Sequence, residues 1–278
     1  MGLRIRSNVA SMSVQSNLRG ADEQQQQEFS KLSSGKRIIK SSDDAAGLGI
    51  AKKIEAETRG LKMAQRNANN GVAMIQVAEG GLQESTNILT RLRELSIQSS
   101  SDTVGEKEKG YLDLEFQQLT SELDRISKTT TFSGKEMLTG KSENGKMEIQ
   151  VGAYAGQENR IVFDTEQSNA TLENLGLSGA SIKTKEDSHE NLQKIDNAID
   201  MIAGFRANFG AIQSRLQTAV SNLDVQALNQ ENARSVIEDV DIAESTSKVA
   251  SVGIIKQAGI MTLSQANNIP RSALSLIG

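Results

Sequence analysis

The clearest pattern in the chain is a series of apolar and small residues that recur in steps of three and four between residues 61 and 92. The positions are Leu61, Ala64, Ala68, Gly71, Ile75, Ala78, Leu82, Ser85, Leu89 and Leu92. This spacing predicts one long helix with coiled-coil-like packing, although an ordinary helical bundle would give a similar period. Because many of these side chains are small, a partner helix can approach closely.

The flanking residues predict where this helix and its neighbours begin and end. Ser41–Asp44 are residue types that cap free N–H groups, so we expect the long helix to start at Ala45. An earlier helix should end near Leu32, where a Ser-Ser-Gly turn follows. Another helix is expected after Gly110, ending at Thr129.

The helical period disappears in residues 130–185, where Gly and Asn become more frequent. Met147–Val151 alternate between apolar and polar residues, which predicts a strand. Arg160–Phe163 would form the return strand, and Gly152–Asn159 the turn between them. We therefore expect a β-hairpin insert.

The helical period returns from Asn191 and reaches Leu223, and a last helical stretch from Val236 is expected to end at Pro270. Both ends of the chain are amphipathic, and neither can bury its apolar face alone. The sequence thus predicts a mainly α fold. Its N- and C-terminal segments would form a long antiparallel helical bundle or coiled coil, with a small β-hairpin insert.

Composition supports long helices and excludes several classes of function. Average usage would give about fourteen prolines, whereas this chain has one in 278 residues. Cysteine is absent and only one histidine is present, which excludes thiolate metal sites, cysteine nucleophiles and multi-histidine zinc sites. Aromatic residues make up 3%, so we do not expect a large aromatic-lined ligand pocket. A net charge of −4 gives no footprint for nucleic acid. The chain also lacks a run of 18 apolar residues, so we expect no membrane insertion.

Three segments resemble chemical motifs but lack an essential part. In His189–Gln193 the second histidine of a zinc protease helix is replaced by glutamine. Gly47–Gly49 lacks the third glycine of a dinucleotide-binding turn. Asp239 and Asp241 lack the glycine and glutamate of a calcium loop. We expect no catalytic activity, no cofactor and no metal.

A larger set of motifs resembles the bacterial flagellin family and extends over nearly the whole chain. The helical motifs are Lys31–Gly35, Asp43–Leu48, Arg66–Gly71, Ala78–Leu82, Arg91–Gln98, Gln257–Gly259, Gln265–Asn268 and Leu274–Leu276, and the β motifs are Met147–Ala153 and Leu175–Leu177. Two departures are visible. Arg6 follows Ile5 where the family often has asparagine, and the family's large variable outer domains are missing.

The resemblance implies a domain organisation. Residues 1–40 and 240–278 would be terminal helices that form an inner coiled-coil domain. Residues 41–130 and 186–239 would form a helical rod domain, with 131–185 as its β-hairpin insert.

The resemblance also implies a function, a location and partners. The chain would be a structural subunit, exported by the flagellar type III pathway without a cleaved signal, that polymerises into the extracellular flagellar filament for swimming. Its partners would be further copies of itself, an export chaperone at the C-terminal helix, the filament cap and hook-junction proteins, and a host Toll-like receptor.

The site residues follow from the periodicity and from the resemblance. Packing in the filament core is expected from Ile5, Val9, Met12, Ile254, Ala258, Met261 and Leu263. The rod-domain seam is expected from Leu61, Ala64, Ala68, Ile75, Ala78, Leu82, Leu89 and Leu92. By resemblance, the innate-receptor contact would be Arg91, Leu95 and Glu115, although Leu95 could equally be the end of a core stripe.

Two other functions are compatible with amphipathic ends. One is a hook–filament junction protein, which would be present in few copies. The other is a signalling or scaffold coiled coil that stays inside the cell.

Overall fold

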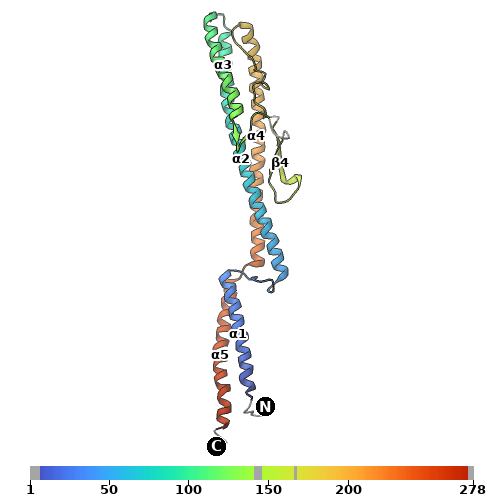
Figure 1. Ribbon diagram of the computed structural model, residues 1–278, viewed down its shortest axis with the longest axis vertical. Coiled ribbons are helices and arrows are strands. Elements are labelled where there is room, and N and C mark those ends of the chain that lie inside the picture. Colours follow the sequence, from blue (N-terminus) through green and yellow to red (C-terminus); the bar gives the residue numbers. More distant parts are fainter. Residues whose placement is uncertain (1–6, 141–145, 166–167, 275–278) are drawn as a thin grey trace. The chain divides into compact units, whose positions relative to one another are not determined.

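The computed structural model describes residues 7–140, 146–165 and 168–274 and confirms a mainly helical fold with a small β insert (Figure 1). The elements are α1 (Val9–Ser34), α2 (Ala45–Ser99), α3 (Glu106–Thr129), β1 (Thr131–Phe132), β2 (Lys135–Glu136), β3 (Lys146–Gln150), the 3-10 turn η1 (Gln157–Asn159), β4 (Arg160–Asp164), α4 (Lys185–Glu238) and α5 (Ile242–Leu274). They form two compact units. The terminal unit comprises Met1–Ala56 with Asn229–Gly278, and the central unit comprises Glu57–Leu228.

These limits differ from the domain limits implied by the sequence, because the terminal unit includes the loop after α1 and the end of α4. The backbone explains this assignment. Arg37 N donates to the Glu238 carbonyl at 2.7 Å, and Val240 N donates to the Gly35 carbonyl at 3.1 Å. The α1–α2 loop is therefore tied to the α4–α5 connection within one unit. The β insert lies inside the central unit.

Each helix of the terminal unit is capped by its own sequence. The Asn8 side chain accepts a hydrogen bond from Ser11 N, and Gly35 ends α1 with a left-handed φ of 69°. Asp241 caps α5 by accepting from the backbone N–H of Ala243 at 2.8 Å. At the start of α2, the side chain of Asp44 accepts from Gly47 N at 2.8 Å. The expected start of α2 at Ala45 is confirmed.

The central unit packs α2, α3 and α4 around one core. Large side chains of this core come from all three helices: Ile75, Leu82, Leu89, Leu92, Phe116, Leu123, Ile195, Ile202, Phe209 and Leu216. Surface ion pairs show that α2 and α4 run antiparallel. Arg93 pairs with Asp196 at 2.7 Å, and Glu79, earlier in α2, lies 3.8 Å from Arg206, later in α4.

The β3–β4 hairpin packs on this core through one face. Its register pairs Met147 with Phe163 and Ile149 with Ile161, and all four side chains are buried. A Cβ added at Gly71 of α2 would lie 2.6 Å from Ile149 Cδ1. The missing side chain at Gly71 therefore makes room for the hairpin.

A buried carboxylate holds the loop that leads into α4. Asp113 of α3 accepts from Ser181 Oγ and from Ile182 N, each at 2.9 Å. Ser99 Oγ, at the end of α2, donates to the Ile182 carbonyl at 2.5 Å, and Asn191 Nδ2 of α4 donates to the Ser181 carbonyl at 2.6 Å. Three helices are thus joined at one short loop segment.

Three sequence expectations were wrong in detail. Gly110 lies inside α3, which begins at Glu106 after a Gly105 cap, because the buried face of the helix outweighs a glycine cost of about 1 kcal/mol. A second hairpin, β1–β2, follows α3 and was not expected. Pro270 does not end the last helix, since α5 extends to Leu274.

Two glycines of α2 should respond oppositely to substitution. Gly71→Leu should lower the free energy of unfolding by about 1–3 kcal/mol, because the side chain would collide with Ile149 and Leu216. Gly80 has no heavy atom within 4 Å of the added Cβ, so Gly80→Ala should raise stability by about 0.5–1 kcal/mol. Urea unfolding followed by circular dichroism measures both. Equal effects at the two positions would contradict the close packing at Gly71.

Candidate functional site

The pairing of α1 with α5 is the first candidate site, because it brings the two ends of the chain together. The less exposed positions of α1 step by three and four, as do those of α5. They are Ser11, Val14, Leu18, Ala21, Gln25, Glu28 and Leu32 on α1, and Ser245, Val249, Val252, Lys256, Gly259, Leu263 and Ala266 on α5. We call these fourteen residues the terminal seam. Its period is that of a coiled coil, but six of its fourteen members are polar residues or glycine.

Specific contacts fix the antiparallel register of the terminal seam. Asn8 Nδ2 donates to the Ala266 carbonyl at 2.8 Å. Asp22 pairs with Lys256 at 2.6 Å. Between them, a Cβ added at Gly259 would lie 2.8 Å from Leu18 Cδ2, so the two helices approach closely there. The residue numbers of these contact partners rise along α1 and fall along α5, so the two helices are antiparallel.

Glu28 places a carboxylate inside this seam. Lys31 Nζ donates to Glu28 Oε1 at 2.8 Å, and this hydrogen bond is the main cause that lowers the pKa of Glu28. Burial opposes the shift, while Ser245 and Lys248 of α5 add to it. The charged form of Glu28 is therefore favoured by groups from both helices.

Most residues expected in the filament core lie outside the terminal seam. Val9, Met12, Ile254, Ala258 and Met261 are all exposed, and Met261 is 74% exposed. Leu263 is the member that belongs to the seam. Ile5 lies outside the described residues.

The Ile254 side of α5 does not take part in the pairing with α1. The contacts to α1 lie at Gly259, which approaches Leu18, and at the Ala266 carbonyl, which accepts from Asn8. The small residues of the seam allow the closer approach, which leaves the larger apolar side chains on the outside. The Ile254 face is therefore free of α1.

The residues expected in the rod-domain seam are all buried in the central unit. Their exposed fractions do not exceed 6%, and they comprise Leu61, Ala64, Ala68, Ile75, Ala78, Leu82, Leu89 and Leu92. Six of the eight belong to the main core, whereas Leu61 and Ala64 pack with Leu223 and Ala227 of α4 in a smaller cluster.

The three residues expected at the innate-receptor contact do not form one exposed surface. Arg91 pairs with Glu115 at 2.8 Å and with Glu94 at 3.0 Å, and all three side chains are about half exposed. The pKa of Arg91 is raised, first by its hydrogen bond to Glu115. Leu95, however, is 0% exposed. It is packed in the core and cannot reach a partner while the central unit is folded.

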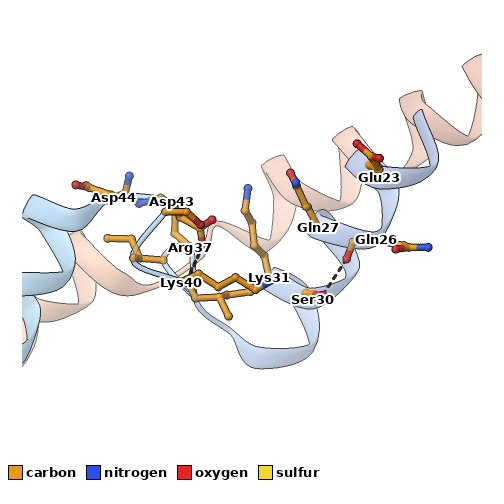
Figure 2. A pocket seen from close by; sticks show the side chains of 12 residues that line it. Glu23, Gln26, Gln27, Ser30, Lys31, Arg37, Lys40, Asp43 and Asp44 are labelled. Carbon is orange, nitrogen blue, oxygen red and sulfur yellow. Dashed lines mark hydrogen bonds between the residues drawn. The ribbon is translucent and has the colours of Figure 1, made fainter. Parts of the chain in front are cut away.

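A pocket of about 610 Å³ lies in the terminal unit between the last turns of α1 and the loop that follows (Figure 2). Its lining residues are Glu23, Gln26, Gln27, Ser30, Lys31, Arg37, Ile38, Ile39, Lys40, Ser42, Asp43 and Asp44. Asp43 accepts from the backbone N–H of Lys40 and of Ile39, which lowers its pKa. Arg37 donates to the Ile237 carbonyl at 2.6 Å. These charged groups already stabilise the loop, which gives the pocket a structural role.

The described residues hold neither a membrane-spanning helix nor a cluster of metal ligands. No helix in residues 7–140, 146–165 and 168–274 is both long and apolar enough to cross a membrane. The same residues contain no group of three acidic, histidine or cysteine side chains that could hold a metal ion.

Acid should weaken the α1–α5 pair through Glu28. Because folding lowers the pKa of Glu28, its contribution to stability is present above the ordinary glutamate pKa of about 4.3 and is lost as the pH falls below it. Glu28→Gln should remove this part of the acid sensitivity, as followed by far-ultraviolet circular dichroism. Glu23→Gln, at an exposed position of the same helix, is the control. An unchanged acid transition in Glu28→Gln would contradict the role of this carboxylate.

Comparison with known proteins identifies the family. The sequence matches the bacterial flagellin N-terminal helical region over residues 5–143 and the bacterial flagellin C-terminal helical region over residues 192–277. It is 36% identical to a flagellin of Halalkalibacterium halodurans, over 98% of this chain and 99% of the relative. It is 37% identical to a flagellar filament 31.3 kDa core protein of Treponema maltophilum, over 91% of this chain and 92% of that protein.

Solved structures agree with this result. The crystal structure of Bacillus cereus flagellin matches with a TM-score of 0.50 and 26% identity, over 61% of this chain and 94% of that one. A putative flagellar hook-associated protein from Vibrio parahaemolyticus matches with a TM-score of 0.57 over 70% of this chain and 99% of that one, but at 12% identity it shows a shared fold alone. The two family regions and the near-full-length relatives show that the chain belongs to the bacterial flagellin family.

Proposed function

We propose that this chain is a structural subunit that is exported and polymerises into the extracellular filament of the bacterial flagellum for swimming. The observation that carries the proposal is the one-sided pairing of the chain ends. α1 and α5 bury the terminal seam, while large apolar residues of α5 remain exposed on its other sides. Membership of a structural family and near-full-length similarity to filament core proteins support it.

The exposed face of α5 would be covered by further copies of the same chain. Ile254, Ala258 and Met261 lie on this face, and Ile255, Ile260 and Ile269 are further exposed apolar residues of α5; the large ones are 47–74% exposed. Exposed apolar surface of this extent on one helix is typical of an interaction site. A contact between this face and a different face of the next subunit does not close on itself, so it builds a helical polymer.

The same face is our proposed site for an export chaperone before assembly. An amphipathic or apolar helix binds such partners by placing its apolar residues in a hydrophobic groove. Chaperone binding and polymerisation would then exclude each other, because both use Ile254, Ala258 and Met261. Filament cap and hook-junction proteins are further proposed partners, at the two ends of the polymer.

A hook–filament junction protein is the alternative that the comparisons favour less. The flagellins and filament core proteins are 32–37% identical to this chain over nearly its whole length. The hook-associated structure shares the fold at 12% identity. A filament subunit should dominate the protein released by shearing flagella, whereas a junction protein would be a trace component.

We further propose that a host Toll-like receptor recognises this chain through direct contacts with Arg91 and Glu115. Both side chains are exposed and lie on adjacent helices, α2 and α3. Leu95 would act through packing, because it is buried in the core of the same unit.

Polar substitution of the α5 face should prevent polymerisation. Ile254→Gln combined with Met261→Gln should abolish seeded filament growth, measured by sedimentation and electron microscopy, because the apolar contact is lost. Val225 is 57% exposed on α4 in the central unit, so Val225→Gln is a matched control that should still polymerise. Normal filament growth by the double variant would falsify the proposed use of this face.

Receptor recognition can be separated from folding by two alanine variants. Arg91→Ala should weaken the response of receptor-bearing reporter cells without lowering the melting temperature of the chain. Leu95→Ala should lower the free energy of unfolding by about 2–5 kcal/mol, because it leaves a cavity in the core. A full response from Arg91→Ala, or none from the unmutated chain, would argue against this contact.

A further inference from the structure

The methionines of this chain differ sharply in exposure. Because cysteine is absent, eight methionines carry all of its sulfur. Three of the described methionines are 9% exposed or less, namely Met74, Met137 and Met147. Three others are at least half exposed, namely Met12 at 66%, Met63 at 50% and Met261 at 74%.

Two of the exposed methionines lie where the chain ends would meet other copies. Met12 belongs to α1 and Met261 to α5, and neither is part of the terminal seam. Met261 continues the apolar face of α5 formed by Ile254 and Ala258. Met63 lies on α2 in the central unit and therefore provides an internal comparison.

We propose that Met12 and Met261 are oxidation sites through which peroxides block assembly of the free subunit. This rests on the proposed function, because it requires that polymerisation buries the exposed faces of α1 and α5. Oxidation converts a flexible apolar side chain into a polar one and disrupts the apolar contacts that it makes.

The chemistry needs only a peroxide and the thioether. A lone pair of the methionine sulfur attacks one oxygen of hydrogen peroxide, so an S–O bond forms as the O–O bond breaks. The leaving hydroxide takes the proton of the hydroxyl group now on sulfur and departs as water. Sulfur loses two electrons and the peroxide gains them, so the reaction is balanced with the sulfoxide as the product. Methionine sulfoxide reductases reverse it, one enzyme for each sulfoxide epimer.

Burial makes the effect depend on the state of the subunit. In the free chain Met12 and Met261 are open to solvent, so they should react as fast as Met63. In the filament their sulfurs would be covered by neighbouring copies and protected. Oxidation would therefore act on subunits that have not yet assembled and spare the finished polymer.

The test treats purified full-length monomer and preformed filaments with hydrogen peroxide and maps each methionine by peptide mass spectrometry. Seeded polymerisation then gives the critical concentration of the monomer before and after peroxide. The quantity compared is the ratio of the value after peroxide to the value before it. We expect this ratio to be about tenfold for the wild type, because a polar oxygen removes much of the gain from burying the side chain. Treatment with both reductases and a dithiol, which supplies the two electrons and is oxidised to a disulfide, should return the ratio to one.

Variants assign the effect to particular sulfurs. The Met12→Leu, Met261→Leu double variant should have a ratio near one, whatever its own starting critical concentration. Met63→Leu should remain as sensitive as the wild type. Melting curves before and after peroxide show whether the central unit stays folded, as the low exposure of Met74, Met137 and Met147 leads us to expect.

The outcomes separate this proposal from the proposed function. A wild-type ratio of one, or equal sensitivity of the double variant, overturns the oxidation sites while leaving filament assembly intact. Oxidation of Met12 and Met261 in filaments at the monomer rate overturns the protection by burial. Failure of untreated wild type to polymerise on seeds overturns the proposed function, and the oxidation proposal with it.

Discussion

The contact on which this structure depends is the antiparallel pairing of α1 with α5. A lone amphipathic helix in water cannot bury its apolar face, so each chain end needs a partner. The terminal seam provides one, but with small and polar side chains such as Ser11, Ala21 and Gly259. Close approach and hydrogen bonds, rather than large apolar knobs, define the register. The larger apolar residues of α5 are consequently left for contacts outside the chain.

In the central unit, the main structural requirement is different: a β insert has to pack against long helices. Gly71 and Gly81 of α2 lack the side chains that would collide with Ile149 and with the loop after β2. Asp113 joins α2, α3 and α4 through one loop segment, since the backbone at Ile182 both donates to its carboxylate and accepts from Ser99. This unit has its own large core, so it does not need the terminal helices for burial.

The regular spacing of apolar residues made the central helices predictable from the sequence. The pairing of the terminal helices was harder to predict, because polar residues interrupt the apolar spacing there. The stripe from Leu61 to Leu92 and the cap before Ala45 identified α2. Alternation identified β3, and β4 was expected as its return strand. The terminal seam was missed because Gln25 and Glu28 occupy core positions where an apolar residue is expected. Leu95 and Arg91 are four residues apart, yet the packing of α3 buries one and leaves the other at the edge. The four-residue spacing alone therefore does not predict which of the two side chains is exposed.

The two ends of the seam differ in a way that matters under mechanical load. At one end Asn8 contacts Ala266, close to both chain termini, and at the other a backbone bridge joins Lys36 to Asp239. Tension that separates the termini would pull the two helices apart one contact after another. Separation would start at Asn8, continue through the Asp22–Lys256 ion pair and end at the bridge. Each step breaks only a few contacts, so peeling needs little force. The same helices loaded along their axes would have to slide, which breaks every seam contact at once and resists far more.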